Sequence, residues 1–390
     1  MAEAYIVDAV RTAGGRRGGR LASMHPVDLA TTVLDALLER TGADPSSIDD
    51  VIMGCVVQTG QQAMNVARNA VLASKLPESV PATTIDRQCG SSQQALHFAA
   101  AAVMSGAMDA VIAGGVESMT RVPMSASTAF PAEHGYGTYV SPALRGRYGV
   151  AEFSQFSGAE MLAEKYELSR SRLDAYSFES HRKASEATQA GAFASEIVPL
   201  DVRAPDGTLV HHAVDEGIRF DATLEGIAAV KLLAPGGRIT AASASQMCDG
   251  ASACLVVGER ALAALGKTPL ARIHHMSVLG HDPVIMLEAP IPATRRALQR
   301  AGMTIDDIDL FEVNEAFAPV PLAWLQATGA DPERLNVHGG AIALGHPLGS
   351  SGTKLMATLV HALQRRGKRF GLQTMCEGGG LANVTIVERL

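Results

Sequence analysis

Two short acidic segments, spaced 257 residues apart, constrain the fold of this chain more than any other feature. Residues 48–51 read Ile-Asp-Asp-Val, residues 305–308 read Ile-Asp-Asp-Ile, and each segment precedes a predicted strand. The same spacing relates Cys89 to His346, and each of these residues lies just before a predicted helix. Both helices lead to a glycine, a strand and a glycine-rich turn. This shared order of elements indicates an internal duplication.

The duplication predicts two similar α/β domains that face each other. A chain of 390 residues exceeds the usual size of one compact core. Strands and helices alternate over residues 1–120 and again from about residue 241, which is typical of a layered α/β fold. Residues 121–240 lose this alternation, and a stretch of that length is rarely plain loop. We expect an inserted domain there, and we expect Cys89 and His346 to meet near a pseudo-twofold axis.

Cys89 lies in a predicted strand-to-helix turn. Residues 81–85 are predicted to form a short buried strand, and the small and apolar residues after Cys89 predict a helix to about Gly106. The free N–H groups and the dipole at a helix N-terminus stabilise a thiolate, which is the nucleophilic form of cysteine. From this segment alone, a nucleophile and a buried structural cysteine are equally good interpretations.

A glycine-rich stretch around His346 supplies a partner. Residues 336–349 hold many glycines around a His-Pro pair, which indicates a backbone that approaches a ligand closely. A neutral histidine can accept the proton of Cys89. A lone histidine is more often structural, but this context favours a base. We interpret His338, in the same stretch, as a supporting polar residue.

Two further segments carry candidate chemistry. Cys376 lies at a predicted strand end beside Gly378 and two more glycines, where a thiol can face a substrate and backbone N–H groups can stabilise an oxyanion. Asn314 follows a predicted strand over residues 309–313. Its amide can hold a water or a developing oxyanion; the alternative is a helix N-cap.

Together these segments resemble the thiolase family over essentially the whole chain. The motifs are C-G-S-S-Q-Q-A, N-E-A-F, G-G-A-I-A-L-G-H-P and C-E-G-G-G, in the order that the family has them. The resemblance implies an α/β thiolase fold with two similar core domains in a five-layered α-β-α-β-α arrangement. It also implies an inserted loop domain that binds coenzyme A. Residues 1–120, completed by 241–268, would form the N-terminal core, 121–240 the loop domain, and 269–390 the C-terminal core.

The resemblance also implies a function and a role for each catalytic residue. The expected enzyme is an acyltransferase that cleaves 3-ketoacyl-CoA with coenzyme A to acetyl-CoA, or propionyl-CoA, and a shortened acyl-CoA, reversibly. Cys89 resembles the acylated nucleophile, His346 the base, and Cys376 the acid/base at C2 of the acetyl unit. Asn314 resembles the residue that holds a water, which forms one oxyanion hole with His346. The N–H groups of Cys89 and Gly378 match the second hole.

Further positions of the chain match those that line the pantetheine channel and the nucleotide end of coenzyme A in the family. Ser245, Met286 and Phe317 fall along the channel, and Arg219 falls where the family has an arginine near the nucleotide. Gln155 stands where a methionine is common beside the pantetheine.

Three other departures, His338, Asp86 and Ser92, leave the catalytic set intact but put the acyl-chain preference in doubt. The motif variants resemble a bacterial branch associated with fatty-acid and sterol breakdown, which favours a longer or bulkier 3-ketoacyl-CoA. The alternatives are a biosynthetic acetoacetyl-CoA thiolase, a ketoacyl synthase-like condensing enzyme, and an inactive acyl-CoA-binding protein. Cys376 argues against the synthase, because such enzymes usually have His or Asn there.

The net charge and the cysteine content limit which partners and which cellular compartment are expected. The net charge of −7 and pI of about 6.0 argue against a general nucleic-acid or membrane-surface binder. Five scattered cysteines without a CxxC pair predict no zinc site and a reducing compartment, and we expect no signal peptide and no membrane span. We therefore expect a cytoplasmic protein that uses coenzyme A as a substrate, without a metal or a tightly bound cofactor. The resemblance implies a homodimer or homotetramer, with an oligomerisation loop within residues 122–148.

Overall fold

The structure is a computed structural model that describes residues 2–204 and 206–390, and its first half builds a mixed β-sheet. The strands are β1 (Tyr5–Thr12), β3 (Asp50–Gly54), β4 (Ala82–Ile85), β5 (Ala110–Ser118) and β9 (Cys248–Val257). Their order is β4-β3-β5-β9-β1. Strand β3 runs parallel to β4 and β5, whereas β9 runs antiparallel to β5 and β1.

The second half repeats this pattern of pairings. Its strands are β10 (Ala271–Gly280), β11 (Leu310–Val313), β12 (Phe370–Glu377) and β13 (Leu381–Glu388). The order is β11-β12-β13-β10, with β11 parallel to β12 and the other two pairs antiparallel. A single parallel bridge from Phe311 to Leu335 stands where β4 stands in the first half. The duplication predicted from the sequence is therefore present in the sheet topology.

The two sheets join along a narrow seam. Strands β1 and β10 pair antiparallel through only Tyr5–Arg272 and Ile6–Ala271. Short strands β2 (Gly15–Arg16) and β6 (Ile197–Val198) pair with β9 and β1 at the margin.

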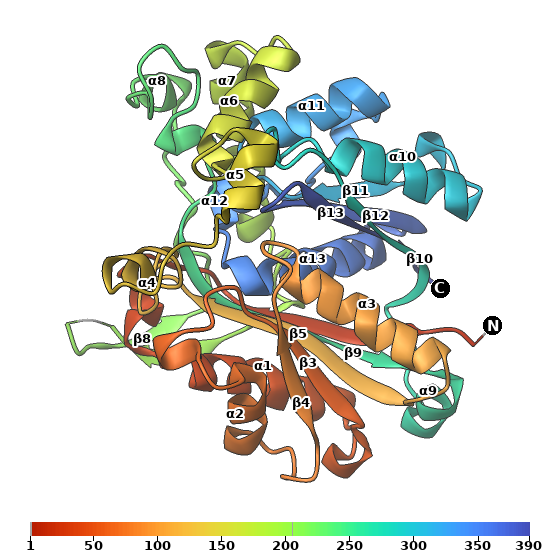
Figure 1. The fold of residues 1–390 in the computed structure, drawn as a ribbon. Coiled ribbons are helices and arrows are strands. Elements are labelled where there is room, and N and C mark those ends of the chain that lie inside the picture. The colour runs from red at the N-terminus through yellow and green to blue at the C-terminus, as the bar shows by residue number, and fades with distance from the viewer. Residues whose placement is uncertain (1, 205) are drawn as a thin grey trace.

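A pair of helices fills the space between the sheets. These are α3 (Ser91–Met104) and α13 (Ser351–Arg366), and one buried cluster joins their apolar side chains to the inner faces of both sheets. Figure 1 shows α13 and α3 between the strands of the two halves. The helices meet closely at Gly352, where a Cβ atom would collide with the backbone of Gln93.

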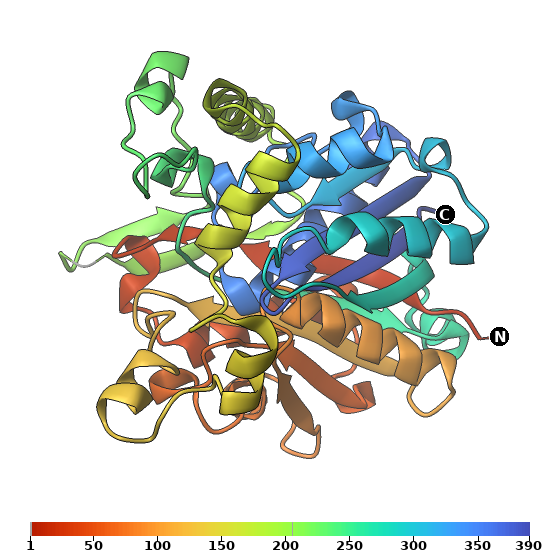
Figure 2. The same ribbon diagram turned by 45° about the horizontal axis from the view of Figure 1, so that its top comes forward.

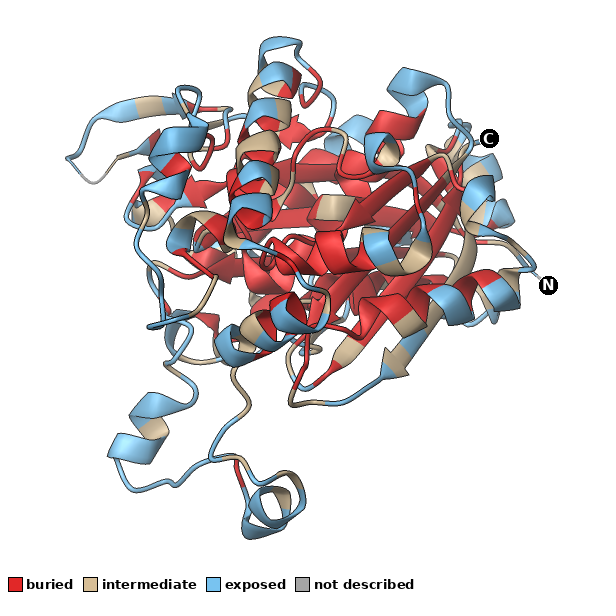
Figure 3. Cartoon of the chain, turned by 90° about the horizontal axis from the view of Figure 1, so that it is seen from above, coloured by how far each residue is buried: buried red, intermediate tan, exposed pale blue. Residues whose placement is uncertain are grey.

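Further helices cover the two outer faces. On the N-terminal sheet these are α1 (Pro26–Thr41) and α2 (Val66–Ala73); on the C-terminal sheet they are α10 (Pro290–Ala301) and α11 (Pro319–Thr328). The order of layers is thus helix, sheet, helix, sheet, helix. The five-layered α-β-α-β-α arrangement expected from the resemblance is confirmed. Figure 3 shows the sheets and central helices as buried and the peripheral helices as largely exposed.

Local signals explain where the elements begin and end. Helix α1 has Pro26 at its first turn, and its N-cap His25 accepts a hydrogen bond from the backbone N–H of Val27. The predicted apolar face of α1, which includes Leu29, Val33 and Leu37, is buried. The helix ends at Gly42, whose φ of 69° is the left-handed conformation that favours glycine.

Residues 121–240 combine helices, a short hairpin and long connecting loops, and they lie at one side of the core. Their elements are α4 (Ala129–Glu133), α5 (Pro142–Tyr148), α6 (Gln155–Lys165), α7 (Arg170–Gln189), the hairpin β7 (Leu200–Arg203) with β8 (Leu209–His212), and α8 (Leu224–Ala228). The break predicted at residues 168–170 between two helices is confirmed. No residue of α4 or α5 is buried, and Figure 2 shows both on the outside of the molecule.

The predicted spacing of the two halves needs one correction. Helices α3 and α13 begin 260 residues apart, at Ser91 and Ser351, because a 3-10 turn over Leu348–Ser350 precedes α13. The helix-for-helix counterpart of Cys89 is therefore Gly349, three residues beyond His346. Among the described residues, we find no helix with the length and apolarity that a membrane crossing requires.

Candidate functional site

A strained turn presents Cys89 at the start of α3. Gln88 has φ of +49°, which is unfavourable for a residue with a side chain. Its backbone N–H donates to Asp86 Oδ1 at 2.6 Å, and its carbonyl accepts from Ser91 Oγ at 2.6 Å. The Ser91 hydroxyl also accepts from the Arg87 backbone N–H at 2.9 Å. These bonds hold the turn, and the Cys89 side chain is left half-buried beside a cavity.

The Cys89 thiol is protonated in this environment. Burial, and to a smaller extent the charge of Glu377, raise its pKa to about 12. A helix N-terminus favours the thiolate, but burial opposes it more strongly at this position. A base must remove the proton before Cys89 can act as a nucleophile.

His346 has the properties of such a base. Its Nδ1 faces the hydroxyl of Ser351, which donates its own proton to the carbonyl of Pro347 at 2.9 Å. The hydroxyl must therefore accept from Nδ1–H, so that Nε2 carries the lone pair of the ring. Burial, and to a smaller extent the charge of Lys354, lower the pKa of His346 to about 3. The imidazole is neutral near pH 7.

Asn314 lies against this histidine. Its backbone N–H donates to the carbonyl of Thr374 at 3.1 Å, and its Nδ2 is 3.4 Å from His346 Nε2. The Asn314 Oδ1 atom is buried without a hydrogen-bond partner among the described residues. The helix N-cap alternative is wrong, since the next helix, α11, begins at Pro319.

Cys376 and Gly378 lie at the end of β12. Cys376 is buried, and burial raises the pKa of its thiol. The two thiols lie on adjoining segments, because the side chain of Glu377, which follows Cys376, packs directly on Gly90, which follows Cys89. A Cβ atom at Gly378 would lie 2.8 Å from Oε1 of Gln88. Glycine therefore lets the backbone after Cys376 approach the turn that carries Cys89.

A cavity of about 510 Å³ lies beside Cys89, and His346, Asn314 and Cys376 are not among the residues that line it. Cys89 and Gly378 line it together with Leu348, which lies two residues beyond His346. Met286 and Gln155 also line it, as expected for positions beside a bound substrate. The remaining lining residues come from the Cys89 turn, from a neighbouring loop and from residues 121–240; they include Asp86, Gln88, Val56, Met124, Ser127, Thr128, Tyr139 and Phe153.

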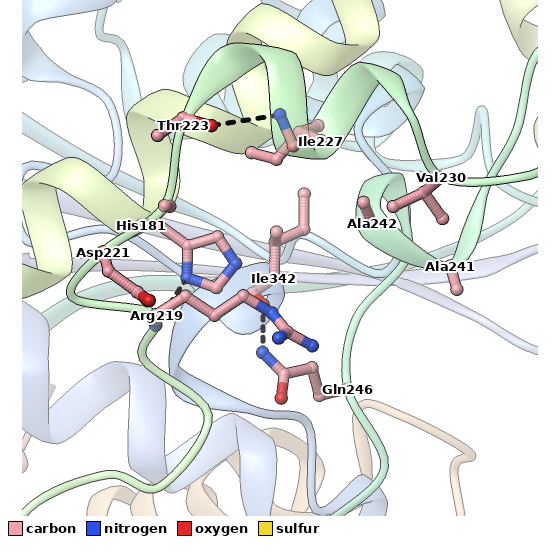
Figure 4. Close-up of a pocket in the computed structure, with 12 residues that line it drawn as sticks. His181, Arg219, Asp221, Thr223, Ile227, Val230, Ala241, Ala242, Gln246 and Ile342 are labelled. Carbon is pink, nitrogen blue, oxygen red and sulfur yellow. Dashed lines mark hydrogen bonds between the residues drawn. The ribbon is translucent and has the colours of Figure 1, made fainter.

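Arg219 lines a separate cavity of about 350 Å³. Figure 4 shows its side chain between His181 and Gln246. The Arg219 backbone N–H donates to His181 Nδ1 at 3.2 Å, and burial lowers the pKa of His181 to about 4. Gln246 Nε2 donates to the carbonyl of Ile342 at 2.7 Å. The structure thus brings Arg219 beside the segment that leads to His346 but not into the Cys89 cavity.

Ser245 and Phe317 lie side by side. The Ser245 backbone N–H donates to the carbonyl of Ala316 at 2.9 Å, and Phe317 forms a bridge with Ala244. The buried Phe317 ring packs edge-to-face on Phe156 at 5.5 Å.

Two of the unusual residues have structural roles. Ser92 is buried, and its Oγ accepts from the backbone N–H of Thr353, so it ties α3 to the first turn of α13. His338 packs edge-to-face on Phe193 at 5.7 Å and lines neither cavity.

Four buried charged residues around the site escaped the sequence analysis: Glu117, Glu315, Lys354 and Glu377. Glu315 and Glu377 occur inside the recognised motifs, directly after Asn314 and Cys376. Their positions next to two candidate catalytic residues are the sequence signal that could have identified them. Lys354 looks like any helical lysine, because nothing local distinguishes a buried one.

Comparison with known proteins agrees with this geometry. The family model described as thiolase, N-terminal domain, matches residues 4–260, and the thiolase C-terminal domain matches residues 267–389. The chain is 53% identical over 392 residues to steroid 3-ketoacyl-CoA thiolase FadA6 of Mycobacterium tuberculosis, covering all of this chain and 95% of that protein. It is 44% identical over 397 residues to a 3-ketoacyl-CoA thiolase of Yersinia pestis, covering both proteins fully.

A solved structure also matches along the whole chain. The crystal structure of human mitochondrial 3-ketoacyl-CoA thiolase superposes with a TM-score of 0.89 at 35% identity, covering all of this chain and 99% of that one. Two family models, full-length relatives and one shared fold lead to the same assignment. The chain belongs to the thiolase family and is an acyltransferase.

Proposed function

We propose that this thiolase cleaves 3-ketoacyl-CoA with coenzyme A to give acetyl-CoA, or propionyl-CoA, and a shortened acyl-CoA. The observation that carries the proposal is that thiols on adjoining segments, Cys89 and Cys376, occur with a neutral histidine whose Nε2 carries a lone pair. The names of the relatives support the same activity.

In the first half-reaction, His346 Nε2 takes the Cys89 proton, and the sulfur attacks the C3 ketone of the substrate. The bond between C2 and C3 then breaks, which leaves the shortened acyl group on Cys89. The departing enolate of acetyl-CoA takes a proton from Cys376. Both thiols start protonated, because burial raises the pKa of each; this suits Cys376 as an acid.

In the second half-reaction, coenzyme A replaces acetyl-CoA. His346 passes the first proton to the Cys376 thiolate, so that both groups are reset, and then takes the proton of the coenzyme A thiol. The resulting thiolate attacks the thioester on Cys89 and releases the shortened acyl-CoA, and the Cys89 sulfur recovers a proton from His346.

Two oxyanions form along this path, and separate donors stabilise them. We assign one to the N–H groups of Cys89 and Gly378, two residues that line the same cavity. We assign the other to His346 with a water held by Asn314, whose buried Oδ1 lacks a partner among the described residues. Each donor of this kind typically lowers a barrier by about 3–4 kcal/mol.

We propose that residues 121–240 form the loop domain that binds coenzyme A. Residues 1–120 with 241–268, and residues 269–390, form the two cores. The cavity at Arg219 suits the nucleotide, because its guanidinium attracts phosphate. Ser245, Met286 and Phe317 would line the pantetheine channel.

The acyl group that we propose is longer or bulkier than acetoacetyl, as in degradative lipid metabolism. The 510 Å³ of the Cys89 cavity is room for more than a two-carbon unit. The 53% identical relative, named a steroid 3-ketoacyl-CoA thiolase, supports a bulky substrate. An acetoacetyl-CoA thiolase is the second candidate, because the catalytic groups would be the same.

Two measurements test these proposals. Mass spectrometry after mixing with acetyl-CoA should find an acetyl group on Cys89 and none in Cys89→Ser; an unmodified Cys89 would reject the acyl-enzyme. A thiolysis panel from acetoacetyl-CoA to steroid side-chain 3-ketoacyl-CoAs should show higher kcat/KM for the larger substrates. A strict preference for acetoacetyl-CoA would instead establish the second candidate.

We further propose a cytoplasmic homodimer or homotetramer that uses coenzyme A as a substrate only. All five cysteines are free thiols, which suits a reducing compartment. Exposed aromatic side chains at Phe130, Tyr136 and Tyr139 suit an oligomer contact within residues 122–148.

A further inference from the structure

Lys354 is a buried cation one turn into α13. Its side chain is 4% exposed, and its ammonium donates to the carbonyls of Leu344 at 2.6 Å and Gly345 at 2.8 Å. Burying an ammonium is costly unless strong partners replace water. These two carbonyls belong to the residues that directly precede His346, so the cation binds the backbone immediately before the proposed base.

The segment that Lys354 holds has little structure of its own. Helix α12 (Ala341–Leu344) is a single turn, and isolated turns are unstable in water. It ends at Gly345, whose φ of 79° favours glycine, and a Cβ atom there would lie 2.7 Å from the sulfur of Cys248. The backbone that reaches His346 therefore depends on tertiary contacts.

A carboxylate holds the opposite end of the same turn. Glu315 accepts from the backbone N–H of Ile342 at 3.1 Å, and the hydroxyls of Tyr176 and Ser180 donate to it at 2.8 and 2.7 Å. Helix α12 thus has a negative side chain at its N-terminus and Lys354 at its C-terminus. Both charges are favourable for the helix dipole, and both satisfy backbone groups that a helix leaves free at its ends.

Lys354 also lies near a network of buried charged residues. Burial lowers the pKa of Lys354, and the charge of Asp215 opposes that fall. Burial acts to raise the pKa of Asp215, but the charges of Arg11 and Lys354 hold it below its usual range. Asp215 pairs with Arg11 at 2.8 Å, and Arg11 pairs with Glu196 at 2.6 Å. Thr358, one turn after Lys354, donates to Glu196 at 2.9 Å. The network therefore links β1, the segment over residues 196–215, and the helix that carries Lys354.

We propose that Lys354 is a positioning residue for His346: it holds the backbone from which the imidazole projects and opposes a second positive charge on that ring. The inference rests on the proposed function, in which His346 must be a neutral base. Ser351 and Asn314, which contact the imidazole, carry no charge. Among the described groups, the charge that shifts the pKa of His346 is that of Lys354.

The test compares Lys354→Met with Lys354→Arg in the full-length protein. The methionine variant keeps the apolar stem but loses both hydrogen bonds and the charge. We expect kcat/KM for thiolysis to fall roughly 10- to 100-fold, since small displacements of a catalytic group cost that much. With the positive charge removed, the pKa of His346 rises. The acid limb, which is the low-pH side of the pH–rate profile for Cys89 acylation, should therefore move to higher pH. Lys354→Arg restores the charge, so its acid limb should stay in place even if its rate is reduced.

Glu315→Gln is the matched control. It loosens the other end of α12 without removing a charge that acts on His346, so the rate should fall while the acid limb stays unchanged. An unchanged acid limb in folded Lys354→Met, or a shift of equal size in Glu315→Gln, would overturn the proposal.

A second readout covers a methionine variant that fails to fold or to react. Nitrogen-15 NMR of labelled histidine in the wild-type and arginine proteins should report a neutral His346 with its proton on Nδ1 down to low pH. A charged His346 at pH 6 in the wild type would reject the inference directly. Because this measurement needs no turnover, it separates failure of the inference from failure of the proposed function.

Discussion

The ionisable side chains of Glu377 and Cys89 both lie beside the N-terminus of α3. Burial raises the pKa of Glu377 to about 8, while the charge of Arg87 opposes that rise. Both carboxyl oxygens lack a hydrogen-bond partner among the described residues, and the group packs so closely on Gly90 that a Cβ atom there would collide with it. A glycine in the motif is thus required by the carboxyl group that faces it. Near pH 7 the carboxyl is mostly protonated, which spares Cys89 a negative neighbour.

Replacing Glu377 with Gln should make Cys89 easier to ionise. Above a pH of about 8 the wild-type carboxyl is charged and raises the pKa of the thiol. The amide cannot ionise, so the pKa of Cys89 should fall and the pH profile of its alkylation by iodoacetamide should move to lower pH. Asp86→Asn, which removes a weaker influence on the same thiol, should move the profile less. Identical profiles for wild type and Glu377→Gln would contradict this account.

Cys376→Ser should separate the two thiols by role. Cys89 and His346 remain, so acetyl-CoA should still acylate the variant, as read by mass spectrometry. Exchange of the C2 protons of acetyl-CoA with deuterium, followed by NMR, should fall to background because a serine hydroxyl is a far weaker acid. Rapid exchange in this variant would assign the proton transfer to another group.

Two loops beside the nucleophile depend on one carboxylate of β5. Glu117 accepts from the backbone N–H groups of Val56 at 2.9 Å, Val57 at 3.1 Å and Gly349 at 2.9 Å, and from the side chain of Gln62 at 2.8 Å. It joins the loop after β3, in the first half of the molecule, to the turn that precedes α13 in the second. The two halves are therefore held together by hydrogen bonds as well as by apolar packing.

Glu117→Leu should destabilise the protein by at least about 3 kcal/mol, because each buried donor left without an acceptor costs about 1–3 kcal/mol. Urea unfolding would measure the change. Glu133→Leu, on the exposed helix α4, should stay within about 0.5 kcal/mol of the wild type. Equal stabilities for the two variants would show that Glu117 does not hold the loops.

The elements could be predicted from the sequence more fully than the contacts among them. Periodicity predicts the buried face of α1, and the small residues after Cys89 predict α3, because both signals are local. The strained φ of Gln88 and the cation beneath Gly345 result from tertiary contacts, which leave no local pattern. The sequence offset of 257 residues that relates Cys89 to His346 is three residues shorter than the offset between the starts of α3 and α13. The difference arises because an extra 3-10 turn precedes α13. Burial of the Cys89 thiol, which raises its pKa, likewise leaves no local pattern in the sequence.

Strand β4 forms the outer edge of the whole arrangement of strands. Nothing in the described chain pairs with its free side, and an open edge invites another strand. Two nearby apolar side chains, Met64 and Leu72, are 88% and 55% exposed. This margin is therefore suited to contact with a second copy of the chain.

Light scattering should give a mass of at least twice the 40.7 kDa of one chain. The double variant Met64→Glu and Leu72→Glu should lower that mass toward one chain, because it places like charges at a shared margin. Neither side chain is buried, so folding should be unaffected, and circular dichroism would check this. A monomeric wild-type protein would refute the expected oligomer.

The central pair α3 and α13 has a consequence for how the molecule unfolds. Neither sheet can detach without exposing the apolar face of a layer that it shares with the other sheet. A duplicated chain whose halves had separate cores would melt in two independent stages, one for each half. Because the shared layer couples the halves, both should instead open in one cooperative transition. The backbone amides of both helices should then exchange with deuterium together, and only through global unfolding.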